Sequence, residues 1–336
     1  MTAQIVKPGE IKGTSEGQSG GRSYINLSTT GDTSFRTIRN FTFQSSRKLF
    51  WSHNNVIIFG EDLAKEGLEK YIDFFLRDPE VRRTVWILIA KGPAGTILEA
   101  DPTLEKIPAS DIGKLIEDRK VTSQVAGVNL HEFASRLFSK TTAPVAPLID
   151  ITEENKQKIA KIIGTAVFKK GQMVGTLNQS ETRGLLWVLD EVGSGIIVVN
   201  APKSGEKVSL EIIRSSTKII PEIKNGTLHI TIEIKEEGNL GEQMAPEDLT
   251  DPILFSSLEK RQAEAIKKEV LSAWEKARQY NTDIFGFGEA VHKKYPKQWE
   301  EIEDEWDDYF PEIKLSLEVE AKLRRSGMTT KPPIQE

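Results

Sequence analysis

Cysteine is absent from this sequence of 336 residues. Without thiols the chain cannot form disulfides, use a thiolate nucleophile, hold an iron–sulfur cluster or build the common cysteine-based zinc sites. Histidine is scarce, and His53, His131, His229 and His292 each fall in a different predicted element. A zinc site needs three or four ligands in one place. The sequence therefore predicts no metal site and no bound cofactor.

The chain also lacks an excess of positive charge and any long apolar run. Lys and Arg number 45 against 50 Asp and Glu, a net charge of -5. A mildly acidic chain has no broad positive field for a phosphate backbone, which argues against nucleic acid as the main partner. No apolar run approaches the roughly 20 residues of a membrane-spanning helix. With 38% apolar and 28% charged residues, the composition is that of a globular protein with two or three domains.

Short catalytic motifs occur, but each lacks an essential part. GQSGG at residues 17–21 fits the G-x-S-x-G pattern, yet no strand precedes it and no helix follows it directly. HEFAS at residues 131–135 lacks the second histidine of a zinc-protease helix. KGPAG at residues 91–95 lacks the Gly-Lys-Ser/Thr of a phosphate loop. The carboxylates over residues 300–308 fit a solvated helix face. No nucleophile, base and oxyanion site assemble, so we expect no enzyme.

The first third alternates between helix and strand patterns. Residues 9–24 are rich in Gly and Ser and predict a mobile loop. Apolar residues at three- and four-residue spacing predict helices over residues 32–51 and 61–78. Short apolar runs at residues 56–60 and 84–92 predict strands buried on both faces. This alternation indicates an α/β or α+β first domain.

Patterns in the second half predict one antiparallel sheet with long helices on one face. Gly171 predicts a hairpin turn, and Leu228, Ile230, Ile232 and Ile234 share one face of a strand. The expected helices cover residues 180–189, 256–281 and 296–310, and the expected strands residues 163–177 (a hairpin), 195–200, 207–215, 227–237 and 311–327.

We therefore predict an α+β protein of three consecutive α/β-type domains. The first covers residues 1–100 and begins inside a strand, as though its first elements were missing. A small middle domain with a linker covers residues 101–155, and the polar residues 151–158 are the linker candidate. The last domain covers residues 156–327, before a disordered tail at residues 328–336.

Several long stretches of the sequence resemble one known family. They are QIVKPGEI, then SSRKLFWSHNNVIIFGEDLAKEGLEKYIDFFLRDPEVR, GTAVFKKGQMVGTLNQSETRGLLWVL and DIFGFGEAVHKKYPKQWEEIEDEWDDYF, in this order. From Gln4 to about Gly327 the chain resembles the Ger(x)C family, the C-subunit lipoproteins of bacterial spore germinant receptors. The resemblance implies a non-catalytic α+β subunit that works with the integral membrane subunits A and B. It also implies a lipid-anchored position on the outer face of the spore inner membrane.

The sequence departs from the family pattern at its start. Family precursors carry a signal peptide and a lipid-carrying cysteine, and this chain has neither, which we read as a truncated form or an altered start. As written it cannot carry the anchor. Direct binding of a small-molecule germinant by this subunit remains the alternative function.

The family signature Trp-Ser-His-Asn lies at the entry to the predicted strand at residues 56–60. We expect His53 and Asn54 to tie down backbone polar groups at this helix-to-strand junction, with partner contact as the alternative role. The candidate junction or partner-contact residues are Arg47, Trp51, His53, Asn54, Arg77 and Asp78.

Overall fold

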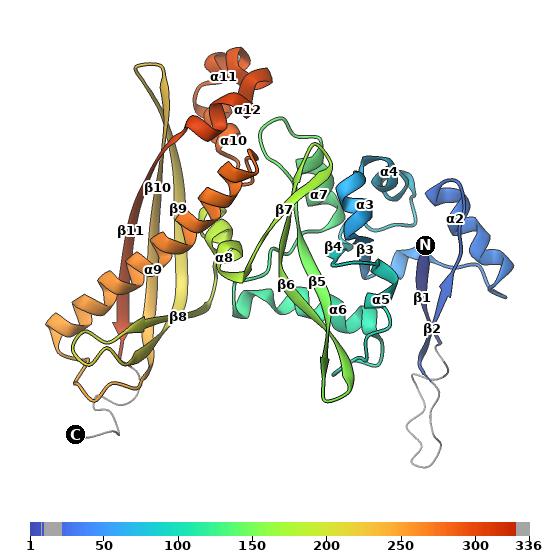
Figure 1. Cartoon of the computed structure of the whole chain (residues 1–336), viewed down its shortest axis with the longest axis horizontal. Helices are drawn as coiled ribbons and strands as arrows, with labels where there is room; N and C mark the ends of the chain where they lie inside the picture. Colours follow the sequence, from blue (N-terminus) through green and yellow to red (C-terminus); the bar gives the residue numbers. More distant parts are fainter. Residues whose placement is uncertain (8, 10–21, 327–336) are drawn as a thin grey trace. The chain divides into compact units, whose positions relative to one another are not determined.

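The computed structural model describes residues 1–7, 9 and 22–326, and its elements are labelled in Figure 1. The predicted loop at residues 9–24 lies largely outside the described residues, and the predicted tail at residues 328–336 lies wholly outside them. The chain forms two compact units. The first unit comprises residues 1–118, 127–138 and 144–176; the second comprises residues 119–126, 139–143 and 177 onward.

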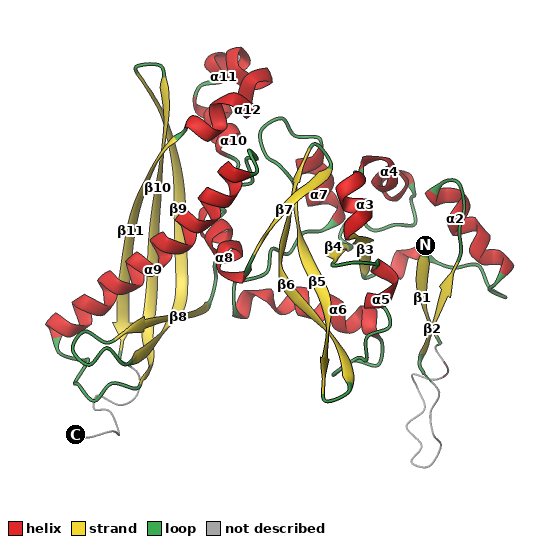
Figure 2. Cartoon of the chain, viewed as in Figure 1, coloured by secondary structure: helices red, strands yellow, loops and turns green. Residues whose placement is uncertain are grey.

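The first unit is built on a five-stranded sheet in the order β3-β4-β5-β6-β7 (Figure 2). The first three strands run parallel, and β5 and β6 are antiparallel. A separate two-stranded antiparallel ribbon, β1-β2, precedes the sheet in the chain. The strands are β1 (Thr2–Val6), β2 (Tyr24–Ser28), β3 (Val56–Gly60), β4 (Trp86–Ala90), β5 (Val145–Glu154), β6 (Gln157–Lys169) and β7 (Gln172–Leu177).

The strands predicted from apolar runs are confirmed as the centre of this unit. In β4, Ile87, Leu88 and Ile89 are fully buried, as expected for a parallel strand covered on both faces. The helices of the unit are α2 (Ser34–Asn40), η1 (Phe41–Phe43), η2 (Trp51–His53), α3 (Glu61–Glu66), α4 (Glu69–Arg77), α5 (Ala94–Ile97), α6 (Pro108–Glu117) and α7 (Leu130–Leu137).

Two predicted helices are shorter than expected. The helix predicted at residues 32–51 ends at η1, because Thr42 and Ser45 turn their hydroxyls to nearby backbone carbonyls and so favour a turn. The helix predicted at residues 61–78 is divided into α3 and α4 by Gly67, whose φ of 123° cannot continue a helix.

The linker predicted at residues 151–158 is instead the hairpin that joins β5 and β6. Asn155 and Lys156 form its turn with φ angles of 52° and 66°. These residues are polar because they are at the tip of a ribbon, which composition alone does not distinguish from a linker. The turn predicted at Gly171 is confirmed between β6 and β7, with a φ of 79°.

The second unit contains a four-stranded sheet in the order β11-β10-β9-β8. β8, β9 and β10 are antiparallel neighbours, and β11 joins β10 in parallel. The buried face of β10 carries Leu228, Ile230, Ile232 and Ile234, as predicted. The strands are β8 (Gly195–Asn200), β9 (Lys207–Lys224), β10 (Thr227–Gln243) and β11 (Lys314–Arg325).

The long helix α9 (Pro252–Gln279) crosses the sheet of this unit (Figure 1). It packs against α8 (Gln179–Val188), where Arg183 and Glu269 form a buried ion pair and the Trp187 indole donates to Glu269 at 3.0 Å. Gly184 lies so close to α9 that an added Cβ would clash with the carbonyl oxygen of Glu269.

Short helices connect α9 to β11. They are α10 (Phe287–Lys294), α11 (Pro296–Ile302), η4 (Glu303–Glu305), α12 (Trp306–Tyr309) and η5 (Phe310–Glu312). A further short helix, η3 (Asp118–Val121), lies much earlier in the chain, directly after α6. The single helix predicted at residues 296–310 is thus several short pieces. Before α10, the buried carboxylate of Asp283 accepts four backbone N–H groups, from Phe285 through Gly288. Burial raises the pKa of Asp283 to about 6 despite these bonds.

The predicted fold class is confirmed: the chain is an α+β protein, and its second unit is a mostly antiparallel sheet with a long helix on one face. The hairpin at residues 163–177 was predicted to belong to this last sheet, but as β6 and β7 it extends the sheet of the first unit. The division into domains at residues 1–100, 101–155 and 156–327 stays a prediction.

Candidate functional site

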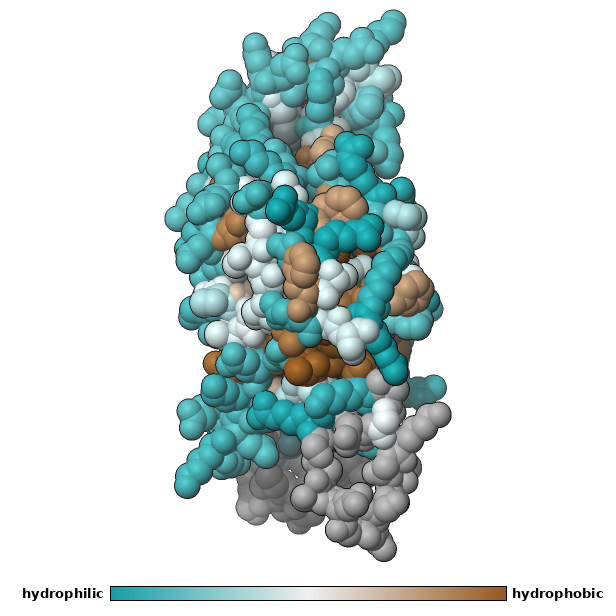
Figure 3. All heavy atoms as spheres, turned by 90° about the vertical axis from the view of Figure 1, so that its right-hand side faces the viewer, coloured by the Kyte–Doolittle hydropathy of each residue, from teal (hydrophilic) through white to brown (hydrophobic). Residues whose placement is uncertain are grey.

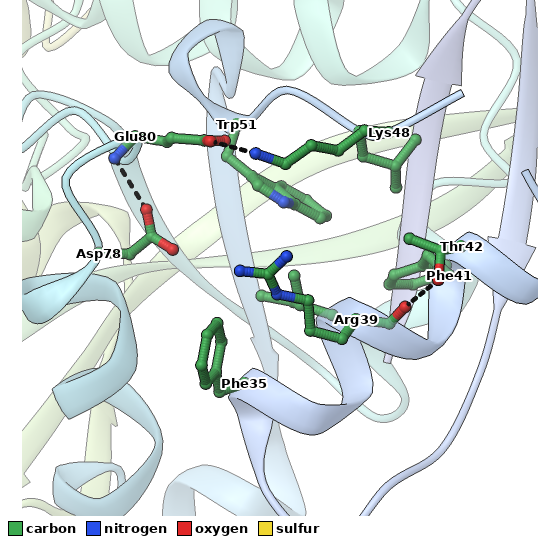
Figure 4. A pocket seen from close by; sticks show the side chains of 10 residues that line it. Phe35, Arg39, Phe41, Thr42, Lys48, Trp51, Asp78 and Glu80 are labelled. Carbon is green, nitrogen blue, oxygen red and sulfur yellow. Dashed lines mark hydrogen bonds and ion pairs between the residues drawn. The ribbon is translucent and has the colours of Figure 1, made fainter.

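A small cleft in the first unit brings together residues from three separate segments (Figure 4). We call it the Trp51 cleft. One wall is α2 with η1. Thr33 caps the start of α2, because its side chain accepts the N–H of Arg36. The other walls are the segment before η2 and the turn that follows α4. The cleft is lined by Phe35, Ile38, Arg39, Phe41, Thr42, Lys48, Leu49, Trp51, Asp78 and Glu80.

Charged groups at the cleft are arranged around aromatic rings. Lys48 and Glu80 form an ion pair at 2.7 Å, which holds the pKa of Glu80 below its ordinary value. The guanidinium carbon of Arg39 lies 5.1 Å from the centre of the Phe35 ring. In Figure 4 this guanidinium points into the space between the rings of Phe35 and Trp51. Among the described residues, Arg39 has no carboxylate within ion-pair distance, but its charge helps to lower the pKa of Glu80.

The volume of the cleft, about 40 Å³, limits what it can bind. Pockets for small ligands usually measure about 300–1,000 Å³. The Trp51 cleft is therefore a surface depression that fits a side chain of another protein better than a metabolite.

The chain around the cleft exposes large apolar side chains. Phe35, Phe43 and Phe50 are 51%, 87% and 62% exposed. The face of the molecule that carries β1, β2 and α2 shows apolar atoms gathered near its middle, within a hydrophilic surround (Figure 3). From residue 33 to residue 60 the sequence contains no Asp or Glu, although the whole chain is acidic. This segment thus combines exposed aromatic rings with basic side chains, of which Lys48 is paired with Glu80 from another segment. Aromatic and Arg side chains are enriched at contact surfaces.

The structure places two of the six candidate residues in the Trp51 cleft, Trp51 and Asp78. Asp78 accepts the backbone N–H of Glu80 at 2.8 Å and so fixes the turn that carries the ion pair. Arg77 instead bonds Asp73 on the exposed side of α4. Arg47 is exposed, and its carbonyl accepts the Ser45 hydroxyl.

His53 and Asn54 lie beside the cleft rather than in it. The exposed imidazole of His53 packs edge-on against the Phe50 ring, with 5.4 Å between the ring centres. No hydrogen bond joins this imidazole to a backbone group elsewhere in the described part of the chain. Asn54 lines a larger cavity on the other side of η2. The role of these two residues at the junction stays a prediction.

Sequence reasoning missed the basic residues of the cleft, Arg39 and Lys48, and the carboxylate of Glu80. The first two carried a readable signal, since the segment without acidic residues contains both. Glu80 did not, because it comes from a turn more than thirty residues away along the chain.

The described residues show no sign of a metal centre: among residues 1–7, 9 and 22–326, no three His, Asp or Glu side chains come together as ligands. Over the same residues, no helix combines the length and the apolar character that a bilayer crossing requires.

Comparison with known families covers nearly the whole chain. A family model described as "Spore germination protein N-terminal domain" matches residues 1–151, and one described as "Spore germination B3/GerAC like, C-terminal" matches residues 163–327. Spore germination protein KC of Bacillus subtilis (strain 168) is 30% identical over 349 residues, with 98% of this chain and 86% of that protein covered. The chain belongs to the Ger(x)C family of spore germination proteins.

More distant Ger(x)C relatives agree over similar lengths. Spore germination protein B3 of the same organism is 24% identical, with 93% of this chain and 84% of that protein covered. The crystal structure of the GerBC protein matches with a TM-score of 0.66 at 21% identity, over 91% of this chain and 90% of that one. The Ger(x)C fold thus extends through both units of the chain.

Proposed function

We propose that this chain is the non-catalytic C subunit of a nutrient germinant receptor. It contributes to spore germination by binding the membrane subunits A and B. The observation that carries the proposal is the match to spore germination protein KC along 98% of the chain. The exposed aromatic and basic residues around the Trp51 cleft support it, because they give a subunit without catalytic groups a surface for protein contacts. As the family resemblance implies, we place the subunit at the outer face of the spore inner membrane, held there by a lipid anchor.

Co-purification tests the proposal. A tagged form of the chain is expressed in sporulating cells, and the A and B subunits recovered with it are measured after detergent extraction of spore membranes. We expect recovery of both. Phe43→Ser and Phe50→Ser each remove an exposed ring near the cleft and should lower recovery about tenfold, since one desolvated aromatic anchor contributes roughly 1.4 kcal/mol or more.

Phe138→Ser is the matched control. Phe138 is 71% exposed in the same unit, but it follows α7 and lies outside the segment of residues 33–60. Its replacement should leave recovery unchanged. A tagged chain that never recovers A or B would sink the subunit assignment. Equal recovery of all three variants would sink only the assignment of the surface.

The second candidate function is direct binding of a small-molecule germinant. A cavity of about 530 Å³ in the first unit has the size of a ligand pocket and favours this candidate. Calorimetric titration with amino acids, sugars and nucleosides tests it. Heats of binding at physiological concentrations would support it, and their absence across all three classes would count against it.

A further inference from the structure

The cavity of about 530 Å³ runs along the edges of two strands, β1 and β3. Its lining includes the consecutive residues 1–4 and all of β3, residues 56–60. Successive side chains of a strand point to opposite faces, so a cavity over one face would touch every second residue only. Contact with consecutive residues means that the cavity borders the strand edges. The neighbours on the other side of these strands, β2 and β4, contribute no lining residue.

Both edges carry backbone groups without a strand partner. Within the described residues β1 pairs only with β2, and β3 only with β4. Met1 and Thr29 exchange two backbone hydrogen bonds, at 2.9 and 3.0 Å. Because such pairs alternate along an antiparallel ladder, the N–H and C=O groups of Thr2 and Gln4 point away from β2, toward the cavity.

The same alternation applies to β3. The carbonyl of Asn55 accepts the N–H of Trp86, so Asn55 faces β4. Ile58, three residues further along, therefore turns its N–H and C=O groups away from β4 and toward the cavity. An open strand edge of this kind is a template for pairing with another strand.

Hydrogen bonds hold the β1-β2 ribbon in place beside the five-stranded sheet, through Leu98 and Ala109. The side-chain amide of Gln4 donates to the carbonyl of Leu98 at 3.0 Å, and its oxygen accepts the N–H of Ala109 at 2.9 Å. Asn26 on β2 also donates to Leu98, at 2.9 Å. The gap between the two edges is thus held open by specific contacts.

The gap has the size and chemistry of a strand. Five extended residues fill on the order of 800 Å³, from a rise of about 3.3 Å, a strand spacing of about 4.8 Å and a sheet spacing of about 10 Å. The cavity supplies most of this volume, and the remainder extends into solvent. Its walls include buried apolar side chains, among them Val56, Phe59 and Phe75. A small molecule in the same place could pair with only part of the two rows of backbone groups, whereas an extended polypeptide can pair with both.

We propose that this cavity accepts one β-strand from a partner protein. The strand is an extended segment of about five residues with apolar side chains toward the walls, and it pairs with Thr2 and Gln4 on one side and with Ile58 on the other. It joins the β1-β2 ribbon and the five-stranded sheet into one continuous sheet. Strand addition at an open edge is a recurrent mode of peptide recognition. The proposal rests on the proposed function in one respect: the strand is supplied by another subunit of the receptor.

A peptide-binding experiment on the full chain tests strand binding in the cavity, independently of whether the chain is a receptor subunit. The probe is a short fluorescent peptide of alternating valine and threonine with a lysine at each end. Its matched control has proline for the central valine, which removes an N–H group that pairing requires. We expect saturable binding of the first peptide by anisotropy, with new hydrogen-exchange protection at Thr2, Gln4 and Ile58. The proline peptide should bind about tenfold more weakly, because a backbone hydrogen bond is lost.

Two substitutions at one position separate pairing from folding. Thr2→Pro removes an N–H that the β1-β2 ladder does not use, and should weaken peptide binding about tenfold. Thr2→Val keeps this N–H and loses only the hydroxyl that bonds Ser28, so it should bind the peptide like the parent chain. Absence of binding by any extended peptide would overturn the proposal, whether or not A and B co-purify. Binding that neither the proline in the control peptide nor Thr2→Pro weakens would also overturn it. The same holds for binding that occurs only when the peptide is fused ahead of Met1.

Discussion

The buried carboxyl group of Glu236 leads us to predict an unusual dependence of stability on pH in the second unit. Glu236 lies on β10 between β9 and β11 and is 1% exposed. Neither of its carboxylate oxygens has a hydrogen-bond partner among the described residues, and the same holds for the amide of Gln262 on α9. Gly238 leaves room for both groups, because a Cβ there would lie 2.8 Å from Glu236 Oε1 and 3.0 Å from Gln262 Nε2. Burial, with the neighbouring charge of Glu237, raises the pKa of Glu236 to about 8.

The sign and size of the effect follow from linkage. Between pH 4.5 and 8 the folded chain keeps a proton that the unfolded chain releases, so the free energy of unfolding falls as pH rises. Each pH unit costs about 1.4 kcal/mol, which gives on the order of 3 kcal/mol by pH 7. Glu236→Gln keeps the shape of the side chain and removes the titration. Its free energy of unfolding should exceed that of the parent by about 3 kcal/mol at pH 7. The two should agree near pH 4.5.

Urea unfolding from pH 4.5 to 8.5, followed by tryptophan fluorescence, measures this difference. Four of the six tryptophans lie in the second unit, so the signal reports mainly the sheet that contains Glu236. Glu237→Gln is the control, because Glu237 is only partly buried and is paired with Arg214 and Arg324. The pairing lowers its pKa to about 2, so this variant should not gain stability at pH 7. If Glu236→Gln and the parent chain lose stability in parallel as pH rises, the reasoning is wrong.

Other substitutions test the packing of the second unit. Gly184→Ala should lower the free energy of unfolding by about 3 kcal/mol through its clash with α9, whereas Gly193→Ala, where a Cβ meets nothing within 4 Å, should change it by less than about 0.5. Glu269→Gln should cost about 3 kcal/mol because it leaves the buried Arg183 charge uncompensated; a small change in urea unfolding would mean that the pair contributes little. Asp283→Asn should cost about 2 kcal/mol, since an amide cannot accept all four N–H groups. A thermal midpoint equal to that of the parent would contradict this last expectation.

Periodicity in the sequence was enough to find most of the strands and the longest helix, but it missed β2 and β5. Alternation along β10 placed Leu228 through Ile234 on the buried face, and the apolar run at β4 gave a strand covered on both sides. Helix ends were harder to predict, because side-chain hydrogen bonds and glycine conformations compete there with continuation of the helix. The hydroxyls of Thr42 and Ser45 and the positive φ of Gly67 each ended a helix whose apolar spacing continued.

Pairings between distant segments were beyond the sequence. The parallel pairing of β10 with β11 depends on the path of the short helices between α9 and β11, which no local pattern encodes. The Trp51 cleft depends on the same kind of information. Lys48 and Glu80 lie 32 residues apart and meet only because α4 returns the chain to the segment before η2. Trp51 was singled out by its signature, but its neighbours could be named only from the structure.

Trp51 also connects the two features proposed as binding sites. It lines the small cleft on one side and the larger cavity beside β3 on the other. Trp51 is the first residue of η2, and β3 begins only five residues later. The position of the Trp51 indole is therefore tied to the strand whose edge is open. A strand that fills the cavity would therefore contact Trp51, and the same indole would still line the cleft with Arg39 and Phe35. Because both sites share the Trp51 side chain, a substitution of Trp51 should affect binding at the cleft and at the cavity together, whereas Arg39 lines only the cleft.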